Sequence, residues 1–165
     1  MNPVSAPFRN QFLFGFVACA GLLAYALYLQ LHAGLVPCPL CIFQRVAFVA
    51  LALVFLTGAV HAPVGKARGI YGVAAVLTAG AGAAVAGRHV WLQSLPPDQV
   101  PTCGPGLDYM LDAMPIAGVI RKVLTGSGEC AKVDWSFLGL SMPAWTLACF
   151  LLLAGWAAFA AFRRV

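Results

Sequence analysis

Two cysteines separated by two residues are the first side chains in this sequence that could do chemistry. They lie in the run Pro37-Cys38-Pro39-Leu40-Cys41, where a short loop leads into a long apolar segment. The prolines favour an extended chain before a helix. The first turn of that helix has unpaired backbone N–H groups and the positive end of the helix dipole, which stabilise a thiolate. Because the thiolate is the reactive form of cysteine, this pair is a candidate for thiol–disulfide chemistry, with Cys41 as the better stabilised sulfur.

Two ionisable side chains could assist this pair. Arg45 follows Cys41 by four residues, so both project from one helical face. Its charge could stabilise the Cys41 thiolate or a carbonyl oxygen that gains charge on reduction; the alternative is an arginine that extends to the membrane interface. His89 lies near the end of the third apolar segment. Ionisable residues at membrane depth are rare and often functional, although a simple interfacial histidine is also consistent with the sequence.

Two further cysteines, Cys103 and Cys130, lie in turn-rich segments of the second half of the chain. Four cysteines can pair in three ways, and a local bridge between Cys38 and Cys41 is the natural one, which leaves Cys103 to pair with Cys130. A mobile, exposed disulfide of that kind could react with a partner protein, whereas two purely structural disulfides are the alternative. A four-thiolate zinc site would show a second closely spaced pair. Cys103 and Cys130 are far apart in the sequence, so no metal is expected.

The composition indicates a membrane protein. Of the 165 residues, 62% are hydrophobic and 9% are charged, whereas a soluble domain has about 45–50% apolar and about 25% charged residues. The net charge of +5 is not concentrated in one stretch, so it does not indicate nucleic-acid binding. The partners expected instead are the lipid bilayer and molecules that reach its surface.

The apolar segments predict a single integral membrane domain over residues 1–165 with four helical spans. The expected spans are residues 11–31, 42–60, 69–92 and 143–162. Ala18-Cys19-Ala20 resembles a signal-peptide cleavage site, but the apolar run continues to Leu31 and is long enough to span. Small residues at four-residue spacing in the third span let helices approach closely in lipid. Cys19 and Cys149 fall inside spans, and we expect both to be small buried hydrophobes.

The basic residues orient the spans. Four spans would place five of them on one side, which the positive-inside rule assigns to the cytoplasm; these are Arg9, Lys66, Arg68, Arg163 and Arg164. Both termini are then cytoplasmic in the inner membrane of a bacterium, and loops 32–41 and 93–142 face the periplasm. All four candidate cysteines outside the spans share that oxidising compartment, where disulfides persist.

The long loop contains a predicted helix. Apolar residues recur at helical spacing over residues 107–124, and Pro115 interrupts the pattern. We expect a broken amphipathic helix on the membrane surface, while a packed helix in a small extramembrane fold is an equal alternative. Trp135 is expected at the interface before the last span. The predicted fold class is an all-α membrane protein: a four-helix transmembrane bundle with a long periplasmic loop that contains a short interfacial helix.

The run Cys-Pro-Leu-Cys-Ile-Phe-Gln-Arg, residues 38–45, resembles the signature of the bacterial DsbB family of disulfide bond formation proteins. The resemblance extends over nearly the whole chain, because Arg-His-Val-Trp-Leu-Gln at 88–93 and the segment from Trp135 to Trp145 also match. One departure is Gln44, where many members have an acidic residue. This substitution leaves its effect on the pKa of Cys41 open.

The resemblance implies a quinone-dependent thiol oxidase, which reoxidises a periplasmic dithiol oxidase of the DsbA type and passes two electrons to ubiquinone or menaquinone. By motif match, the reduced partner attacks Cys103, Cys130 then attacks Cys38, and Cys41 is released beside the quinone. The same match implies that Arg45, His89 and Met142 line the quinone pocket.

Two other functions are consistent with parts of the sequence. A protein similar to vitamin K epoxide reductase would share the four-helix bundle and the Cys-x-x-Cys pair. There the pair lies near the end of the bundle in chain order, whereas here it follows the first span. A non-catalytic membrane scaffold with structural disulfides is the alternative from a different class.

Overall fold

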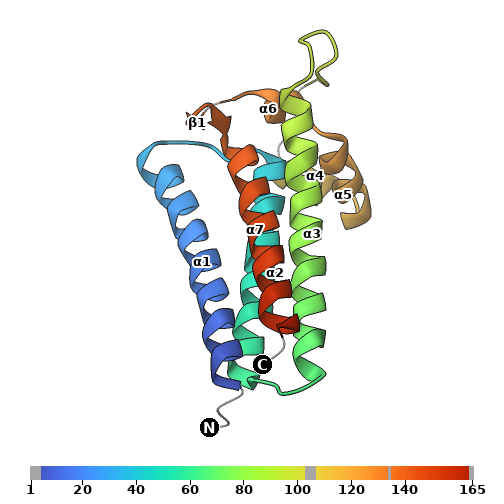
Figure 1. The fold of residues 1–165 in the computed structure, drawn as a ribbon. Helices are drawn as coiled ribbons and strands as arrows, with labels where there is room; N and C mark the ends of the chain where they lie inside the picture. Colours follow the sequence, from blue (N-terminus) through green and yellow to red (C-terminus); the bar gives the residue numbers. More distant parts are fainter. Residues whose placement is uncertain (1–4, 103–106, 134, 164–165) are drawn as a thin grey trace.

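The computed structural model describes residues 5–102, 107–133 and 135–163, and Figure 1 shows a bundle of long helices. Each of these is long and apolar enough to cross a membrane. They are α1 (Ser5–His32), α2 (Pro39–His61), α3 (Ala67–Gln93) and α7 (Met142–Phe162). The four predicted spans each lie within one of these helices, so the all-α membrane bundle is confirmed.

Short elements fill the long connection between α3 and α7. They are α4 (Leu107–Ala113), α5 (Ile116–Thr125), α6 (Gly128–Ala131), β1 (Ser136–Phe137) and β2 (Leu140–Ser141). The predicted helix over residues 107–124 forms and is broken at Pro115, whose extended backbone precedes α5. Its position on the membrane surface stays a prediction. The strands β1 and β2 pair in an antiparallel hairpin just before α7.

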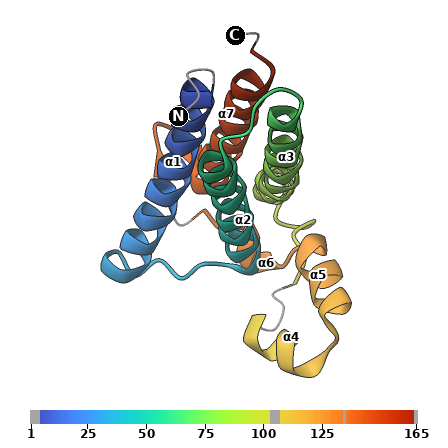
Figure 2. The ribbon, with the colours of Figure 1, turned by 90° about the horizontal axis from the view of Figure 1, so that it is seen from below.

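The helices are not packed evenly around the bundle. α3 packs along α2 and α7, and α1 packs along α2, whereas α1 and α7 touch over a shorter stretch. Seen from below in Figure 2, α1 tilts away from the other three helices toward its C-terminal end. The tilt separates α1 from α7 at the end of the bundle where α2 begins.

Small residues bring α3 close to α7, as their spacing predicts. A Cβ atom on Gly72 would collide with Cβ of Ala161, and one on Gly82 would collide with the ring of Phe150. Phe150 in turn stacks on Phe48 of α2, with ring centroids 4.0 Å apart. Both rings belong to the buried core of the bundle.

Four basic residues of the described chain, Arg9, Lys66, Arg68 and Arg163, belong to the segments at the end of the bundle that holds both termini and the α2–α3 loop (Figure 1). Arg164 lies outside the described residues. Arg68 is buried rather than solvated: it donates a hydrogen bond to the carbonyl oxygen of Ala160 at 2.8 Å and lies over the ring of Phe8. The candidate redox residues lie at the opposite end, where α2 begins and α3 ends. Which end faces the cytoplasm stays a prediction.

Candidate functional site

The first turn of α2 positions Cys38 and Cys41. The helix begins at Pro39, three residues before the predicted start, with Cys38 as its N-cap. Proline suits this position because its missing N–H has no partner in a first turn anyway. The Cys38 sulfur accepts a hydrogen bond from the Cys41 N–H at 3.4 Å, and the two Sγ atoms lie 3.1 Å apart. Both are free thiols in this structure, and a small side-chain rotation would bring them to the bonding distance of about 2.05 Å.

Cys130 lies on the other side of Cys38. It projects from α6 and is 1% exposed. Its Sγ, the Sγ of Cys38 and Nε2 of His89 all lie within 4.8 Å of one another. Hydrogen bonding to Cys38 and burial raise the pKa of the Cys130 thiol. Cys38 is therefore the common neighbour of two other sulfurs. Cys103 lies outside the described residues, so its contact with Cys130 stays a prediction.

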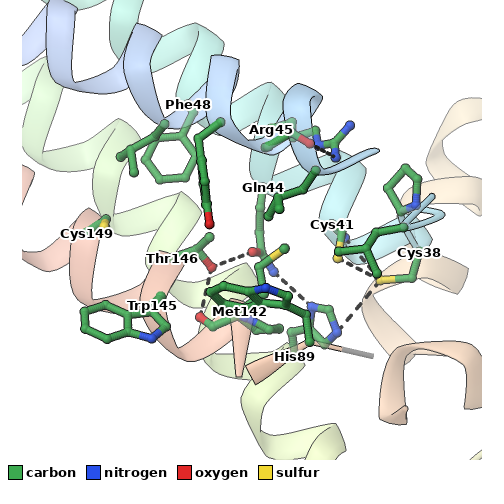
Figure 3. Close-up of a pocket in the computed structure, with 18 of the residues that line it drawn as sticks. Cys38, Cys41, Gln44, Arg45, Phe48, His89, Met142, Trp145, Thr146 and Cys149 are labelled. Carbon is green, nitrogen blue, oxygen red and sulfur yellow. Dashed lines mark hydrogen bonds between the residues drawn. The ribbon is translucent and has the colours of Figure 1, made fainter. Parts of the chain in front are cut away.

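His89 connects three elements at this point. Its ring is 2% exposed near the end of α3. Nε2 lies 3.0 Å from the carbonyl oxygen of Cys130 and 3.8 Å from the Cys38 sulfur, and Nδ1 lies 3.1 Å from Nε2 of Gln44 (Figure 3). The imidazole is thus fixed from both sides among the thiols.

Gln44 has a larger part in the site than the sequence indicated. Its side chain is 3% exposed, and besides His89 it contacts Thr146, whose hydroxyl donates to Oε1 at 2.6 Å. From the sequence, Gln44 was considered only for its effect on the pKa of Cys41, and Thr146 was not identified as a site residue. The available signal was an amide in an otherwise apolar span, three residues after Cys41. That polar side chain needs a partner, because burying an amide without a hydrogen bond is costly.

Arg45 points toward α1. Its guanidinium donates to the side chain of Gln30 and, at 3.3 Å, to the carbonyl oxygen of Ala26. Its hydrogen bonds therefore go to α1 rather than to Cys41. It nevertheless lines the same cavity as Cys41, so its charge is available to an anion there.

A cavity of about 390 Å³ opens between α1, α2 and α7 beside the sulfurs. Apolar side chains of α1 form one wall, and the polar side is formed by Cys38, Cys41, Gln44, Arg45, His89 and Thr146. Phe48, Met142 and Trp145 also line it (Figure 3). Its size falls within the range of about 300–1,000 Å³ for small-molecule sites. The lining is therefore mainly apolar, with hydrogen-bonding side chains from α2, α3 and α7.

One residue differs from its predicted surroundings. Cys19 is fully buried as expected, but Cys149 is half-buried and lines the cavity.

Arg88, near the end of α3, contacts the long loop. It donates to the carbonyl oxygens of Leu124 and Thr125 at 3.1 and 3.0 Å. It therefore caps the C-terminal end of α5, where unpaired carbonyls and the negative end of the dipole favour a cation.

Comparison with known proteins gives consistent results along the chain. The family model for disulfide bond formation protein DsbB matches residues 8–160. Disulfide bond formation protein B of Xanthomonas campestris pv. campestris strain 8004 is 56% identical, over 99% of this chain and 96% of that protein. The proteins of that name from Methylococcus capsulatus and Hahella chejuensis are 54% and 51% identical. These alignments cover 87% of both chains for the first and 94% of both chains for the second.

Proposed function

The chain belongs to the DsbB family of disulfide bond formation proteins, and from this we propose that it oxidises a periplasmic dithiol protein of the DsbA type and transfers the two electrons to a membrane quinone. The observation that supports the proposal most is the position of Cys38. Its sulfur lies 3.1 Å from that of Cys41 and within 4.8 Å of that of Cys130. Thiol–disulfide exchange needs an attacking sulfur close to the sulfur under attack, and a third sulfur that leaves.

The proposed cycle begins with two disulfides, Cys38–Cys41 and Cys103–Cys130. A thiolate of the reduced partner attacks Cys103, so that a mixed disulfide forms and Cys130 leaves as a thiolate. Cys130 then attacks Cys38: a Cys38–Cys130 bond forms, the Cys38–Cys41 bond breaks, and the electron pair stays on the Cys41 sulfur. The helix dipole of α2 stabilises the negative charge on Cys41.

The cycle closes in two further exchanges. The second thiolate of the partner attacks the mixed disulfide, which releases the oxidised partner and the Cys103 thiolate. Cys103 then attacks Cys130, which restores Cys103–Cys130 and frees Cys38. The net result is an oxidised partner and a reduced Cys38/Cys41 pair, which holds the two electrons.

The cavity next to Cys41 is the proposed site for ubiquinone or menaquinone. A bound quinone would supply the oxidant, since it takes up two electrons and two protons as the Cys38–Cys41 bond reforms. Arg45 would stabilise a ring oxygen, and His89, Met142 and Phe48 would line the ring pocket. The apolar wall of α1 would exclude water from the reacting sulfur. In this proposal the protein lies in the bacterial inner membrane with both termini in the cytoplasm, an orientation that the basic residues at the opposite end support.

The test is a turnover assay with purified protein, a reduced DsbA-type partner and a soluble quinone analogue. We expect oxidation of the partner to depend on the quinone. Replacing any of Cys38, Cys41, Cys103 or Cys130 by Ser should abolish turnover. Replacing Cys19 by Ala is the matched control and should leave turnover intact, because its thiol lies in the bundle core.

A scaffold with structural disulfides would give a different result. Its Cys38–Cys41 bridge would be neither reduced by the partner in the absence of quinone nor reoxidised on quinone addition. Thiol trapping at each stage reads this out directly. Full activity of Cys103→Ser would exclude the relay even if the protein oxidised thiols by another route.

A further inference from the structure

The thiol form of this protein brings together three atoms that bind metal ions. They are Sγ of Cys38 at the start of α2, Sγ of Cys130 on α6 and Nε2 of His89 on α3, all within 4.8 Å of one another. Cys130 and His89 are almost completely buried. The sequence argument against zinc counted thiolates alone. It could not include His89, which lies 51 positions after Cys38 in the chain.

The distances suit a tetrahedral cation with little rearrangement. Bond lengths of about 2.3 Å to sulfur and about 2.0–2.1 Å to nitrogen place the ligand atoms of a tetrahedral zinc site about 3.5–3.8 Å apart. The separation of the Cys38 sulfur and the His89 nitrogen is 3.8 Å. The Cys41 sulfur, 3.1 Å from that of Cys38, is available as a fourth ligand after a small rotation.

Gln44 and Thr146 provide the outer support that such a site needs. A histidine that binds a metal through one nitrogen usually donates the other N–H to an acceptor, which fixes the ring. Gln44 lies at Nδ1 of His89, and turning its carboxamide over presents the oxygen to that nitrogen. Its NH₂ group then donates to the Thr146 oxygen, and the Thr146 hydroxyl donates to the carbonyl oxygen of Pro143, which is 2.9 Å away. Nδ1 of His89, Gln44 and Thr146 then all keep partners. Nε2 of His89 gives up its hydrogen bond to the carbonyl oxygen of Cys130, 3.0 Å away, and its lone pair becomes available to a metal.

We propose that the reduced protein binds one thiophilic divalent cation of the Zn²⁺ type through Cys38, Cys130 and His89. Binding displaces the thiol protons and needs no oxidant. A Cys38–Cys41 disulfide excludes the cation because the Cys38 sulfur cannot serve both bonds well. The site therefore exists only in the reduced protein. If the proposed function holds, the cation stops turnover by occupying the sulfurs that exchange.

The binding test uses the full chain in lipid nanodiscs, reduced with a phosphine and free of quinone and partner. Titration with Co²⁺ should give the visible absorption of a tetrahedral sulfur-ligated ion at one equivalent, and Zn²⁺ should displace it. A Cys103→Ser background excludes that sulfur as a ligand. The oxidised protein should show no such absorption. The absence of the absorption in the reduced protein, or equal absorption in the oxidised protein, would overturn the proposal.

Variants identify the ligands. Cys130→Ser and His89→Ala should each weaken Zn²⁺ binding at least tenfold, and Gln44→Leu should weaken it by about 10–100-fold through loss of the outer support. The matched control is the Cys19→Ser/Cys149→Ser double variant, which removes two thiols of the spans and should bind normally. Undiminished binding by both ligand variants would contradict the assignment. In the unmutated protein, Zn²⁺ should slow alkylation of Cys130 at least tenfold, and unchanged alkylation would also overturn it.

The activity arm separates this inference from the proposed function. Zn²⁺ added to the reduced protein should delay turnover. Zn²⁺ added to the oxidised protein should leave the first round of partner oxidation unchanged, because the site does not yet exist. Metal binding by a protein with no quinone-dependent activity would refute the proposed function alone. Turnover by a protein that binds no metal would refute the metal site alone.

Discussion

His89 is held by hydrogen bonds at both of its ring nitrogens, and Gln44 provides the one that lies within the spans. The amide contacts His89 at 3.1 Å and Thr146 at 2.6 Å, so one side chain of α2 links α3 to α7. Buried polar networks of this kind stabilise a fold when every member has a partner and destabilise it when one partner is lost.

Gln44→Leu should therefore lower the free energy of unfolding. The change leaves Nδ1 of His89 without its buried partner, which costs about 1–3 kcal/mol. The Thr146 hydroxyl loses Gln44 but keeps the carbonyl oxygen of Pro143 at 2.9 Å. Unfolding in mixed detergent micelles measures the change. Gln44→Glu is the matched control, since a carboxyl group can still contact both residues. A Gln44→Leu variant as stable as the unmutated protein would show that the network contributes nothing to stability.

Arg45 lines the cavity while its hydrogen bonds go to α1, which allows its two roles to be separated. Arg45→Met should raise the KM for quinone by about ten- to a hundredfold, because a hydrogen bond to a charged group contributes about 1.5–3 kcal/mol. Gln30→Leu removes a contact between Arg45 and α1 and keeps the charge. Steady-state kinetics over a range of quinone concentrations distinguishes them. An equal rise in KM for both variants would mean that Arg45 acts by holding α1 in place.

At the scale of elements, α5 is held against the bundle from two directions. Val119 and Val123 pack with Leu40 and Leu92 at the ends of α2 and α3, in the same cluster as Cys130. Arg88 caps the last carbonyls of α5. The segment that positions Cys130 thus depends on contacts with the membrane helices.

Arg88→Ala should loosen α5. Loss of two hydrogen bonds and of a cation at the helix C-terminus amounts to about 1–3 kcal/mol of local stability. Hydrogen–deuterium exchange over residues 116–125 should become faster, and so should alkylation of Cys130 in the reduced protein. Arg121→Ala, which removes an exposed arginine of α5 itself, is the matched control. Unchanged exchange in Arg88→Ala would show that the packing of Val119 and Val123 is sufficient.

At the scale of the whole molecule, the close contact between α3 and α7 determines the floor of the cavity. Gly82 faces Phe150, and Phe150 stacks on Phe48, which lines the cavity. A larger side chain at Gly82 would therefore displace Phe150, and Phe150 would displace Phe48 in the cavity wall.

Gly82→Ala should destabilise the bundle by about 1–3 kcal/mol, the usual cost of overpacking, and should raise the KM for quinone. Gly80→Ala is the matched control in the same helix, because a Cβ atom there meets nothing within 4 Å. Unfolding and quinone kinetics of the two variants provide the comparison. If Gly82→Ala and Gly80→Ala had the same stability and the same KM for quinone, Gly82 would not be needed for the close approach of α3 and α7.

The sequence was sufficient for the features that depend on local composition. Long apolar runs give the four helices, and Pro115 breaks the loop helix, because both effects act within a few residues. The contact of Gln44 with His89 and Thr146 joins residues 45 and 102 positions apart. No local pattern encodes such a contact, since it depends on how the helices are rotated in the bundle. The exposure of Cys149 to the cavity depends on the same rotation.

The sulfur of Cys38 has one covalent valence to share between two neighbours. A molecule that joins it to Cys130 has, by that fact, an unbridged Cys41, and the reverse holds as well. The two linkages are therefore mutually exclusive isomers, and each copy of the chain handles a single pair of electrons before it can accept the next. Peptide mapping during turnover should never find both linkages in one copy of the chain, and the two together should not exceed one per chain.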